Sequence, residues 1–273
     1  MDRGYVLHTY PYRETSLILQ VWTEKHGRLG LVAKGARRPK SPQRVVLVPF
    51  QPLSLDWFGR GELRTLKTAE PTAPATPLAG QALLSAFYLN ELLLKLTTRD
   101  DPHEGLFEAY DEAITSLRAL SRSMKTGDRP QEPRQGRGPS PEPVLRRFEL
   151  RLLQELGYAV QLDREAGSLA PIVAEREYLY VVERGPIAAS AGEERPDAIR
   201  LRGLTLLDLE RGRFEDPTTI AQAKSLMRLL INHSLNGQEL ATRAMVRDLQ
   251  RFDGDRPRDS GVLSPDGTGN DKT

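Results

Sequence analysis

Hydrophobic and polar positions alternate in short stretches over the first part of the chain. These stretches cover residues 5–10, 17–23 and 29–34, a broad region from 45 to 58, and residues 63–69. Turn-forming residues separate them, namely Pro11, Gly27, Gly35, Gly59 and Gly61. An alternation with a period of two, interrupted by glycine and proline, is typical of β-strands. The pattern therefore predicts five strands.

Five short strands in about 70 residues, with a longer excursion between the third and the fourth, predict a small barrel of the oligonucleotide-binding (OB) kind. Pro49 and Pro52 lie in the broad fourth region, and proline cannot donate a ladder hydrogen bond. The fourth strand is therefore predicted to lie at an edge of the sheet or to begin late in that region. We place this domain at residues 1–72.

The hydrophobic spacing becomes helical after a proline-rich connector. Residues 78–96 are apolar on nearly all sides, which predicts a buried central helix. Further helices are predicted around residues 106–120 and at 144–156, 204–211, 217–235 and 239–250. Asp216 and Pro217 mark the start of the fifth of these six helices, and Asn236-Gly237 marks its end. The fold class is therefore α+β, with the barrel followed by a mostly helical domain at 78–250.

Three segments lack a helical period. Residues 121–143 contain five prolines, three glycines and eight charged residues, and residues 252–273 contain few large apolar ones. Both segments are predicted to be disordered, because they offer no hydrophobic core. Residues 178–182 have the composition of a strand, and Gly185-Pro186 is predicted to turn it into a hairpin.

Positive charge is concentrated in the predicted barrel. Residues 1–70 contain 12 Lys and Arg against 6 Asp and Glu, whereas the rest of the chain contains 27 against 31. No acidic residue occurs between 25 and 44, and 7 of the 17 aromatic residues lie in the first 70. Cations and aromatic rings on one sheet suit a nucleic-acid strand, since cations bind phosphates and rings stack on bases. The candidate DNA-binding residues are Arg28, Lys34, Arg37, Arg38, Lys40, Arg44, Arg60, Arg64 and Lys67.

The same aromatic residues could instead fill the barrel core, which is the commoner place for large apolar side chains. The sequence contains little that would support catalysis or cofactor binding. The chain has no cysteine, its four histidines are scattered, and Ala36-Arg37 stands where a phosphate-binding loop needs Lys-Ser or Lys-Thr. We therefore expect no enzyme activity, no metal and no cofactor. The alternatives are an interaction scaffold with a solvated basic face and a nucleotide-dependent enzyme.

Several short motifs stand out along the chain. They are Tyr12-Arg13-Glu14-Thr15-Ser16-Leu17, Ala33-Lys34-Gly35-Ala36-Arg37-Arg38, Gly59-Arg60-Gly61-Glu62-Leu63, Tyr88-Leu89-Asn90-Glu91-Leu92-Leu93, Leu145-Arg146-Arg147-Phe148-Glu149-Leu150, Leu156-Gly157-Tyr158 and Leu235-Asn236-Gly237. Together these motifs resemble those of the bacterial recombination mediator RecO family. The resemblance covers roughly residues 1–245. It implies an OB barrel followed by a helical domain. It also implies a non-enzymatic, cytoplasmic protein that binds single- and double-stranded DNA, anneals complementary strands and works with RecR, single-strand-binding protein and the recombinase RecA.

Two details of the family bear on the helical domain. Many members carry a four-cysteine zinc site in the region that corresponds to residues 162–191, and this chain resembles the zinc-free branch, with a degenerate finger-like hairpin there. The resemblance also makes the helical domain a receptor for the acidic, phenylalanine-ended tail of single-strand-binding protein. We expect the tail to contact Leu117, Leu120, Arg146, Arg147, Phe148, Arg151 and Arg228.

Overall fold

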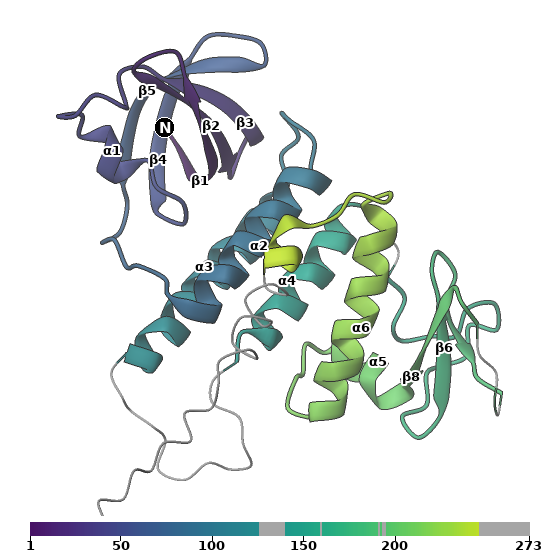
Figure 1. Ribbon diagram of the computed structural model, residues 1–273. Coiled ribbons are helices and arrows are strands. Elements are labelled where there is room, and N and C mark those ends of the chain that lie inside the picture. The colour runs from purple at the N-terminus through teal and green to yellow at the C-terminus, as the bar shows by residue number, and fades with distance from the viewer. Residues whose placement is uncertain (126–139, 159, 191, 193–194, 246–273) are drawn as a thin grey trace, which may run out of the picture.

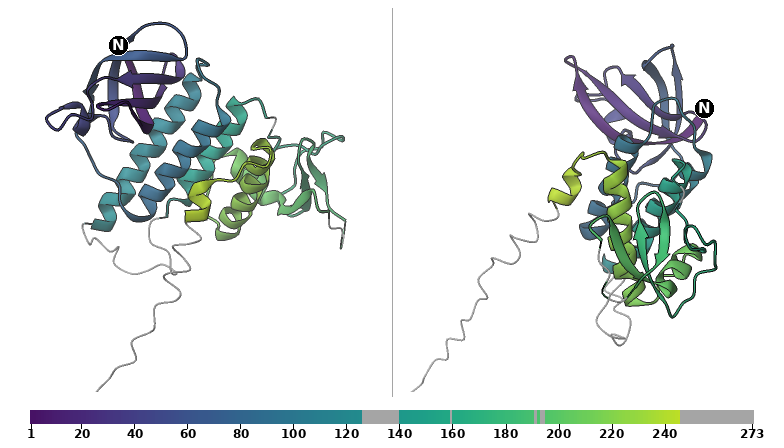
Figure 2. Two further views of the ribbon diagram at one scale, coloured as in Figure 1. Left: turned by 45° about the horizontal axis from the view of Figure 1, so that its top comes forward. Right: turned by 90° about the vertical axis from the view of Figure 1, so that its right-hand side faces the viewer.

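The computed structural model describes residues 1–125, 140–158, 160–190, 192 and 195–245. A β-barrel lies at one end, a small sheet lies at the other, and helices fill the space between them (Figure 1). Two further views show the same order of parts (Figure 2). The predicted α+β class, with an N-terminal barrel followed by a helical region, is confirmed.

Five strands close the barrel in the order β1-β2-β3-β5-β4. They are β1 (Asp2–Tyr12), β2 (Ser16–Thr23), β3 (Gly27–Ala33), β4 (Pro52–Phe58) and β5 (Leu63–Pro71). Neighbouring strands are antiparallel except for β3 and β5, which are parallel. Alternate residues point inward, and the interior is filled by Val6, Leu19, Val21, Leu29, Leu31, Leu53, Leu55 and Leu66.

The broad fourth region contains a short helix and a strand. Helix α1 (Gln43–Val46) precedes β4, whose first residue is Pro52. The late start is therefore confirmed, since proline is tolerated at the first position of a strand. The predicted edge position is wrong, because β4 pairs with both β1 and β5 and closes the barrel.

The helices are α2 (Gly80–Leu96), α3 (Glu104–Lys125), α4 (Glu142–Glu155), α5 (Gly203–Glu210) and α6 (Pro217–Ser234). The predicted disordered loop at 121–143 is wrong at both ends, because α3 continues to Lys125 and α4 begins at Glu142. Residues 126–139 of that loop lie outside the described residues. Of the last predicted helix, residues 241–245 are helical, residues 239–240 are not, and residues 246–250 lie outside the described residues, as does the tail at 252–273.

The small sheet has the order β7-β6-β8, with β6 (Glu177–Val181), β7 (Gly185–Ala188) and β8 (Ala198–Arg202). The hairpin does not turn at Gly185-Pro186. These residues open β7 and pair with Val181 and Tyr180, and residues 182–184 form the turn. Strand β8 was not predicted, and its short alternation of Ile199 and Leu201 is the signal that could have revealed it. Within the described residues, no group of three or more acidic or histidine side chains could hold a metal ion.

Hydrogen bonds join the barrel to the helices. The side-chain amide of Asn90 on α2 donates to the carbonyl oxygen of Leu7 (2.8 Å), and the Tyr110 hydroxyl on α3 donates to Asn90 (2.6 Å). Tyr5 and Trp22 are buried at this junction with the helical core. In the part of the chain that the structure describes, no helix is long and apolar enough to cross a membrane.

Candidate nucleic-acid interface

Most of the predicted DNA-binding residues lie on one loop. The loop after β3, residues 34–44, carries five cations that are all exposed, and Arg60 is exposed on the turn between β4 and β5. Among the described residues, none of these six side chains forms an ion pair. The five on the loop are Lys34, Arg37, Arg38, Lys40 and Arg44. We call residues 34–44 the basic loop.

The basic loop has a defined backbone. Gly35 adopts a left-handed conformation (φ 70°), which glycine accepts without steric cost and which turns the chain after β3. The Arg37 backbone N–H donates to the Thr15 carbonyl (2.8 Å), and the Arg37 guanidinium donates to the Arg13 carbonyl (3.3 Å). These bonds fix the basic loop to the turn between β1 and β2. Arg13 is itself exposed, and sequence reasoning did not include it among the candidate cations.

Three predicted DNA-binding residues have partners within the protein. Arg28 is partly buried at the junction and donates to the Thr97 carbonyl (2.7 Å). Burial, and then the neighbouring Arg99, lower the pKa of Arg28 below its usual value. Arg64 pairs with Asp100, and Lys67 pairs with Asp56 (2.9 Å). Arg28 therefore holds the two domains together, which corrects its assignment to the DNA surface.

An apolar row crosses the outer surface of the barrel. The strand registers place Tyr10 opposite Ile18, Ile18 opposite Val32, Val32 opposite Thr65, and Thr65 opposite Phe58. Tyr10 is 47% exposed and Phe58 is 57% exposed, and the other three are partly exposed. We call these five residues the outer row.

Cations accompany the outer row. Lys67 follows Thr65 by two positions on β5 and is exposed, and Lys34 is the first residue after β3, two positions after Val32, and is also exposed. Tyr10 and Phe58 are two of the aromatic residues that the sequence alone could not assign either to the core or to the surface. Tyr5, Trp22 and Phe50 are buried, as the alternative assignment to a core expected, but they belong to the cluster shared with the helices and not to the barrel interior. The barrel thus combines exposed rings with nearby cations, as an unstacked nucleic-acid strand requires; Lys34 forms no ion pair among the described residues, and Lys67 pairs with Asp56.

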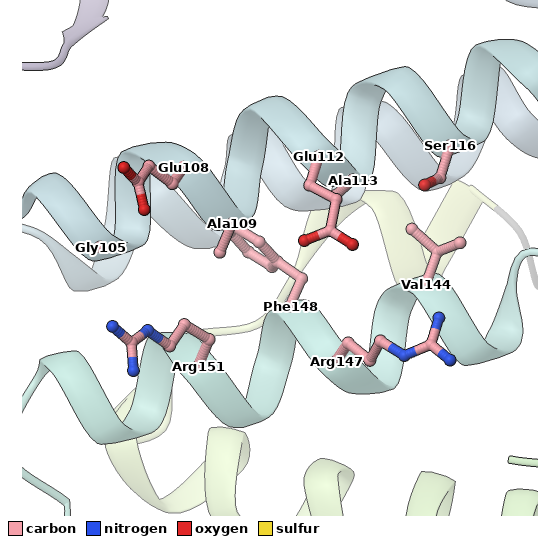
Figure 3. A pocket seen from close by; sticks show the side chains of 10 residues that line it. All are labelled: Gly105, Glu108, Ala109, Glu112, Ala113, Ser116, Val144, Arg147, Phe148 and Arg151. Atoms are coloured by element: carbon pink, nitrogen blue, oxygen red, sulfur yellow. The ribbon is translucent and has the colours of Figure 1, made fainter. Parts of the chain in front are cut away.

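A second concave feature lies between α3 and α4 (Figure 3). This α3–α4 groove has a volume of about 350 Å³. Its floor includes Ala109, Ala113, Val144 and Phe148, and its sides carry Glu108 and Glu112 on α3 and Arg147 and Arg151 on α4. Three predicted partner-binding residues, Arg147, Phe148 and Arg151, are therefore brought together here.

The other predicted partner-binding residues do not line the groove. Leu117 is fully buried in the helical core, and Leu120 packs against that core. Arg228 is exposed on α6, and it is not among the residues that line the groove. Sequence reasoning missed Glu108 and Glu112, although their spacing of four residues places both on one face of α3.

Arg146 is not a surface residue. Its side chain is 6% exposed and contacts the buried Glu149 carboxylate through two nitrogens, each at 2.9 Å. The Tyr88 hydroxyl donates to the same carboxylate (2.6 Å). Burial raises the pKa of the Glu149 carboxyl, although Arg146 and Tyr88 oppose the rise. Arg146 therefore neutralises a buried charge and is not available to a partner.

Comparisons with known proteins agree with this architecture. A family model described as "Recombination protein O N terminal" matches residues 1–75, and one described as "Recombination protein O C terminal" matches residues 135–244. The chain is 49% identical over 247 residues to a "DNA repair protein RecO" of Azoarcus sp. (strain BH72), which is 90% of this chain and 94% of the relative.

Other relatives show a similar degree of identity. The "DNA repair protein RecO" of Nitrosospira multiformis is 47% identical over 249 residues, and that of Aromatoleum aromaticum is 46% identical over 249. Each match covers 91% of this chain and 95% of the relative. Together with the two family matches and the five-stranded barrel, these identities show that the chain belongs to the RecO family of DNA repair proteins.

Proposed function

We propose that this protein is a DNA-binding mediator of recombinational repair and that the barrel is its DNA-binding surface. The observation that carries this proposal is the outer row of exposed side chains together with the cations of the basic loop, none of which forms an ion pair among the described residues. A single strand would stack its bases on Tyr10 and Phe58 and place its phosphates along the basic loop. Double-stranded DNA would use the phosphate contacts alone, since its bases are already stacked.

Membership of a family of DNA repair proteins supports the proposed mediator role. The protein would bind single- and double-stranded DNA, anneal complementary strands and, together with RecR, help to load the recombinase RecA onto DNA that is coated by single-strand-binding protein. It needs no catalytic residue, because annealing and loading depend on binding free energy. The alternatives are a scaffold whose basic loop is only solvated and a nucleotide-dependent enzyme.

Replacement of Arg37 and Arg38 by alanine tests the DNA surface. Each lost phosphate contact should reduce the slope of log affinity against log salt concentration by about 0.7 for a single strand. The measurement is fluorescence anisotropy of a labelled oligonucleotide at several salt concentrations. Arg211→Ala/Arg213→Ala is the matched control, because it removes two cations from the loop after α5.

An unchanged slope in the Arg37→Ala/Arg38→Ala variant would contradict the proposed DNA path. No salt-dependent binding by the wild type would favour the scaffold, and nucleotide turnover would favour the enzyme. Strand annealing with and without single-strand-binding protein then tests the mediator role itself.

We also propose that the α3–α4 groove receives the acidic, phenylalanine-ended tail of single-strand-binding protein. Phe148 and the two alanines offer an apolar floor for the terminal ring, and Arg147 and Arg151 offer cations for the carboxylates. Ring burial would supply most of the affinity, and the charges would set the register. Arg147→Glu/Arg151→Glu should weaken binding of a fluorescent tail peptide at least about tenfold, or about 1.4 kcal/mol. If the folded variant binds the peptide as tightly as the wild type does, the tail binds at another site.

A further inference from the structure

The charges of the α3–α4 groove are divided between its two sides. Arg147 and Arg151 lie along α4, and Glu108 and Glu112 line the groove from α3, where the Glu112 side chain points toward α4 and that of Glu108 lies along α3 (Figure 3). Each pair is spaced by four residues, which is about 6 Å along a helix axis. Within the described residues, no ion pair joins the two sides. The groove is therefore an open slot with a basic side and an acidic side.

The partners of these four residues differ. Arg151 pairs with Glu155 on its own helix (2.7 Å), and the Arg147 guanidinium lies over the Phe214 ring at 5.2 Å and donates to the Gly212 carbonyl (3.3 Å). The arginines are thus held along α4. Glu108 and Glu112 are exposed, and neither forms an ion pair or a side-chain hydrogen bond in the described part of the structure. Their charges are not used by the fold.

We propose that Glu108 and Glu112 are specificity-determining residues that keep the DNA backbone out of the groove and admit a peptide. This inference rests on the proposed tail-binding role of the groove. The arginines of α4 would otherwise form a second phosphate site next to a DNA-binding barrel. Side chains that carry the same charge as an unwanted ligand repel it, and such repulsion is a common source of specificity. Here the two glutamates would repel the phosphates of DNA.

The geometry of the two polyanions explains how one groove can separate them. A nucleic-acid strand carries a charge at every phosphate, so a strand that follows Arg147 and Arg151 also brings its phosphates past Glu108 and Glu112. An extended peptide projects successive side chains to opposite sides. Its carboxylates can therefore face α4 while apolar or polar side chains face α3. The acidic side repels the strand more than it repels such a peptide.

Competition between the two ligands tests the proposal. The probes are a short fluorescent peptide in which aspartate alternates with serine and which ends in phenylalanine, and an unlabelled oligothymidine. For the wild type, saturating oligothymidine should leave the peptide dissociation constant unchanged within about twofold. For Glu108→Gln/Glu112→Gln, it should raise that constant at least about fivefold, because DNA can now occupy the groove. Peptide affinity without DNA should also rise in this variant.

A matched control removes the same charge from elsewhere. Glu175→Gln/Glu210→Gln changes two exposed carboxylates outside the groove and should behave as the wild type does. Competition in the wild type, or its absence in Glu108→Gln/Glu112→Gln, would overturn the proposal.

A second measurement is independent of the peptide. In an Arg37→Ala/Arg38→Ala background, the added glutamine pair should raise oligothymidine affinity at least about fivefold. If the peptide fails to bind but this rise occurs, the tail-binding role fails and the exclusion of DNA is supported. If the peptide binds but no rise occurs, the tail-binding role is supported and the exclusion of DNA is wrong.

Discussion

At the scale of single residues, aromatic side chains of the barrel have opposite roles according to the face of the strand on which they lie. Trp22 is fully buried against the helical domain, whereas Tyr10 and Phe58 point outward at the two ends of the outer row. Trp22 stabilises the fold, whereas Tyr10 and Phe58 are available to stack on bases. Substitution should separate these roles.

Tyr10→Ala and Phe58→Ala are expected to weaken binding of single-stranded DNA by about 1–3 kcal/mol for each stacked base that is lost. The slope of affinity against salt should stay unchanged, because no phosphate contact is removed. Fluorescence anisotropy at several salt concentrations measures both quantities. Val45→Ala, at an 80% exposed position on α1 outside the row, is the control. A reduced slope with unchanged affinity would assign these rings a different role.

Arg146 and Arg147 are neighbours in sequence with different surroundings. Arg146→Ala leaves Glu149 buried without its cation, and loss of one partner of a buried pair costs about 3–5 kcal/mol of the free energy of unfolding. Arg147→Ala loses an exposed stack over Phe214, at about 0.5–1 kcal/mol, and an exposed hydrogen bond to the Gly212 carbonyl (3.3 Å). Urea denaturation should resolve the difference. Similar unfolding midpoints for the two variants would show that the buried pair contributes little.

At the scale of elements, three residues of α2 hold the segment at residues 239–245. Lys95 donates to the Glu239 carbonyl (2.7 Å), Tyr88 contacts Arg243, and the Glu91 carboxylate makes the largest number of hydrogen bonds. Glu91 accepts hydrogen bonds from the backbone N–H groups of Ala241 (2.8 Å) and Thr242 (2.9 Å) and from the Thr242 hydroxyl (2.6 Å). Glu91 thus acts as the N-cap of a helical turn that is distant in sequence. Burial alone would raise its pKa, but these bonds and Lys95 hold the pKa of Glu91 below its usual value.

Glu91→Gln should destabilise the attachment of residues 239–245 by about 1 kcal/mol at neutral pH. A carboxyl whose pKa is lower in the folded state stabilises the fold above its unfolded pKa, about 4.3, and that contribution is lost as the pH falls through the folded pKa. The wild type and the variant should therefore converge in acid. Hydrogen exchange of residues 239–245 measures this, with Glu239→Gln as the control. Equal protection at neutral pH would contradict the capping role.

At the scale of the whole molecule, the barrel and the helices share one hydrophobic cluster that includes Tyr5, Leu7 and Trp22. The buried amide of Asn90 donates to the Leu7 carbonyl and accepts from the Tyr110 hydroxyl, so these polar groups of the junction are paired, whereas the Trp22 indole nitrogen is buried there without a hydrogen-bond partner. An interface of this kind fixes the basic loop relative to the α3–α4 groove. DNA and a peptide would then be held at a constant separation.

The two parts should accordingly unfold in one transition. In a Trp57→Phe variant, Trp22 is the sole tryptophan, and its fluorescence reports on the junction. Its thermal unfolding midpoint should coincide with the loss of helical circular dichroism. Two separate midpoints would show that the barrel and the helical domain unfold independently.

The fold should also be independent of metal. Cysteine is absent from the chain, and the small sheet packs through Tyr178 and Tyr180, which are both buried. Prolonged treatment with a chelator should therefore leave the melting temperature unchanged. A lower melting temperature after chelation would reveal a metal that the side chains of the small sheet do not explain.

Local patterns of residues were sufficient to predict most of the helices and strands of this protein. The alternation of the strands, the N-cap at Asp216 and the glycine after α4 predicted elements that the structure contains, because each depends on neighbours along the chain. The concentration of cations at residues 25–44 likewise predicted the basic loop. The end of α3 and the start of α4 were predicted less well. The prolines and glycines between them indicated disorder, although the first and last residues of that segment are helical.

Tertiary structure decided which side of each element is covered, and therefore what each residue can do. The sequence predicts that Arg28 contacts DNA, but its guanidinium bonds to the Thr97 carbonyl at the end of α2. The sequence also predicts that Arg146 contacts a partner, but its side chain is buried against Glu149. The outer row exists only because five strands place one residue each at the same height. The sequence by itself determined the elements and their charge, because both are local. Pairing, burial and the α3–α4 groove depend on contacts between distant segments, so only the folded chain could determine them.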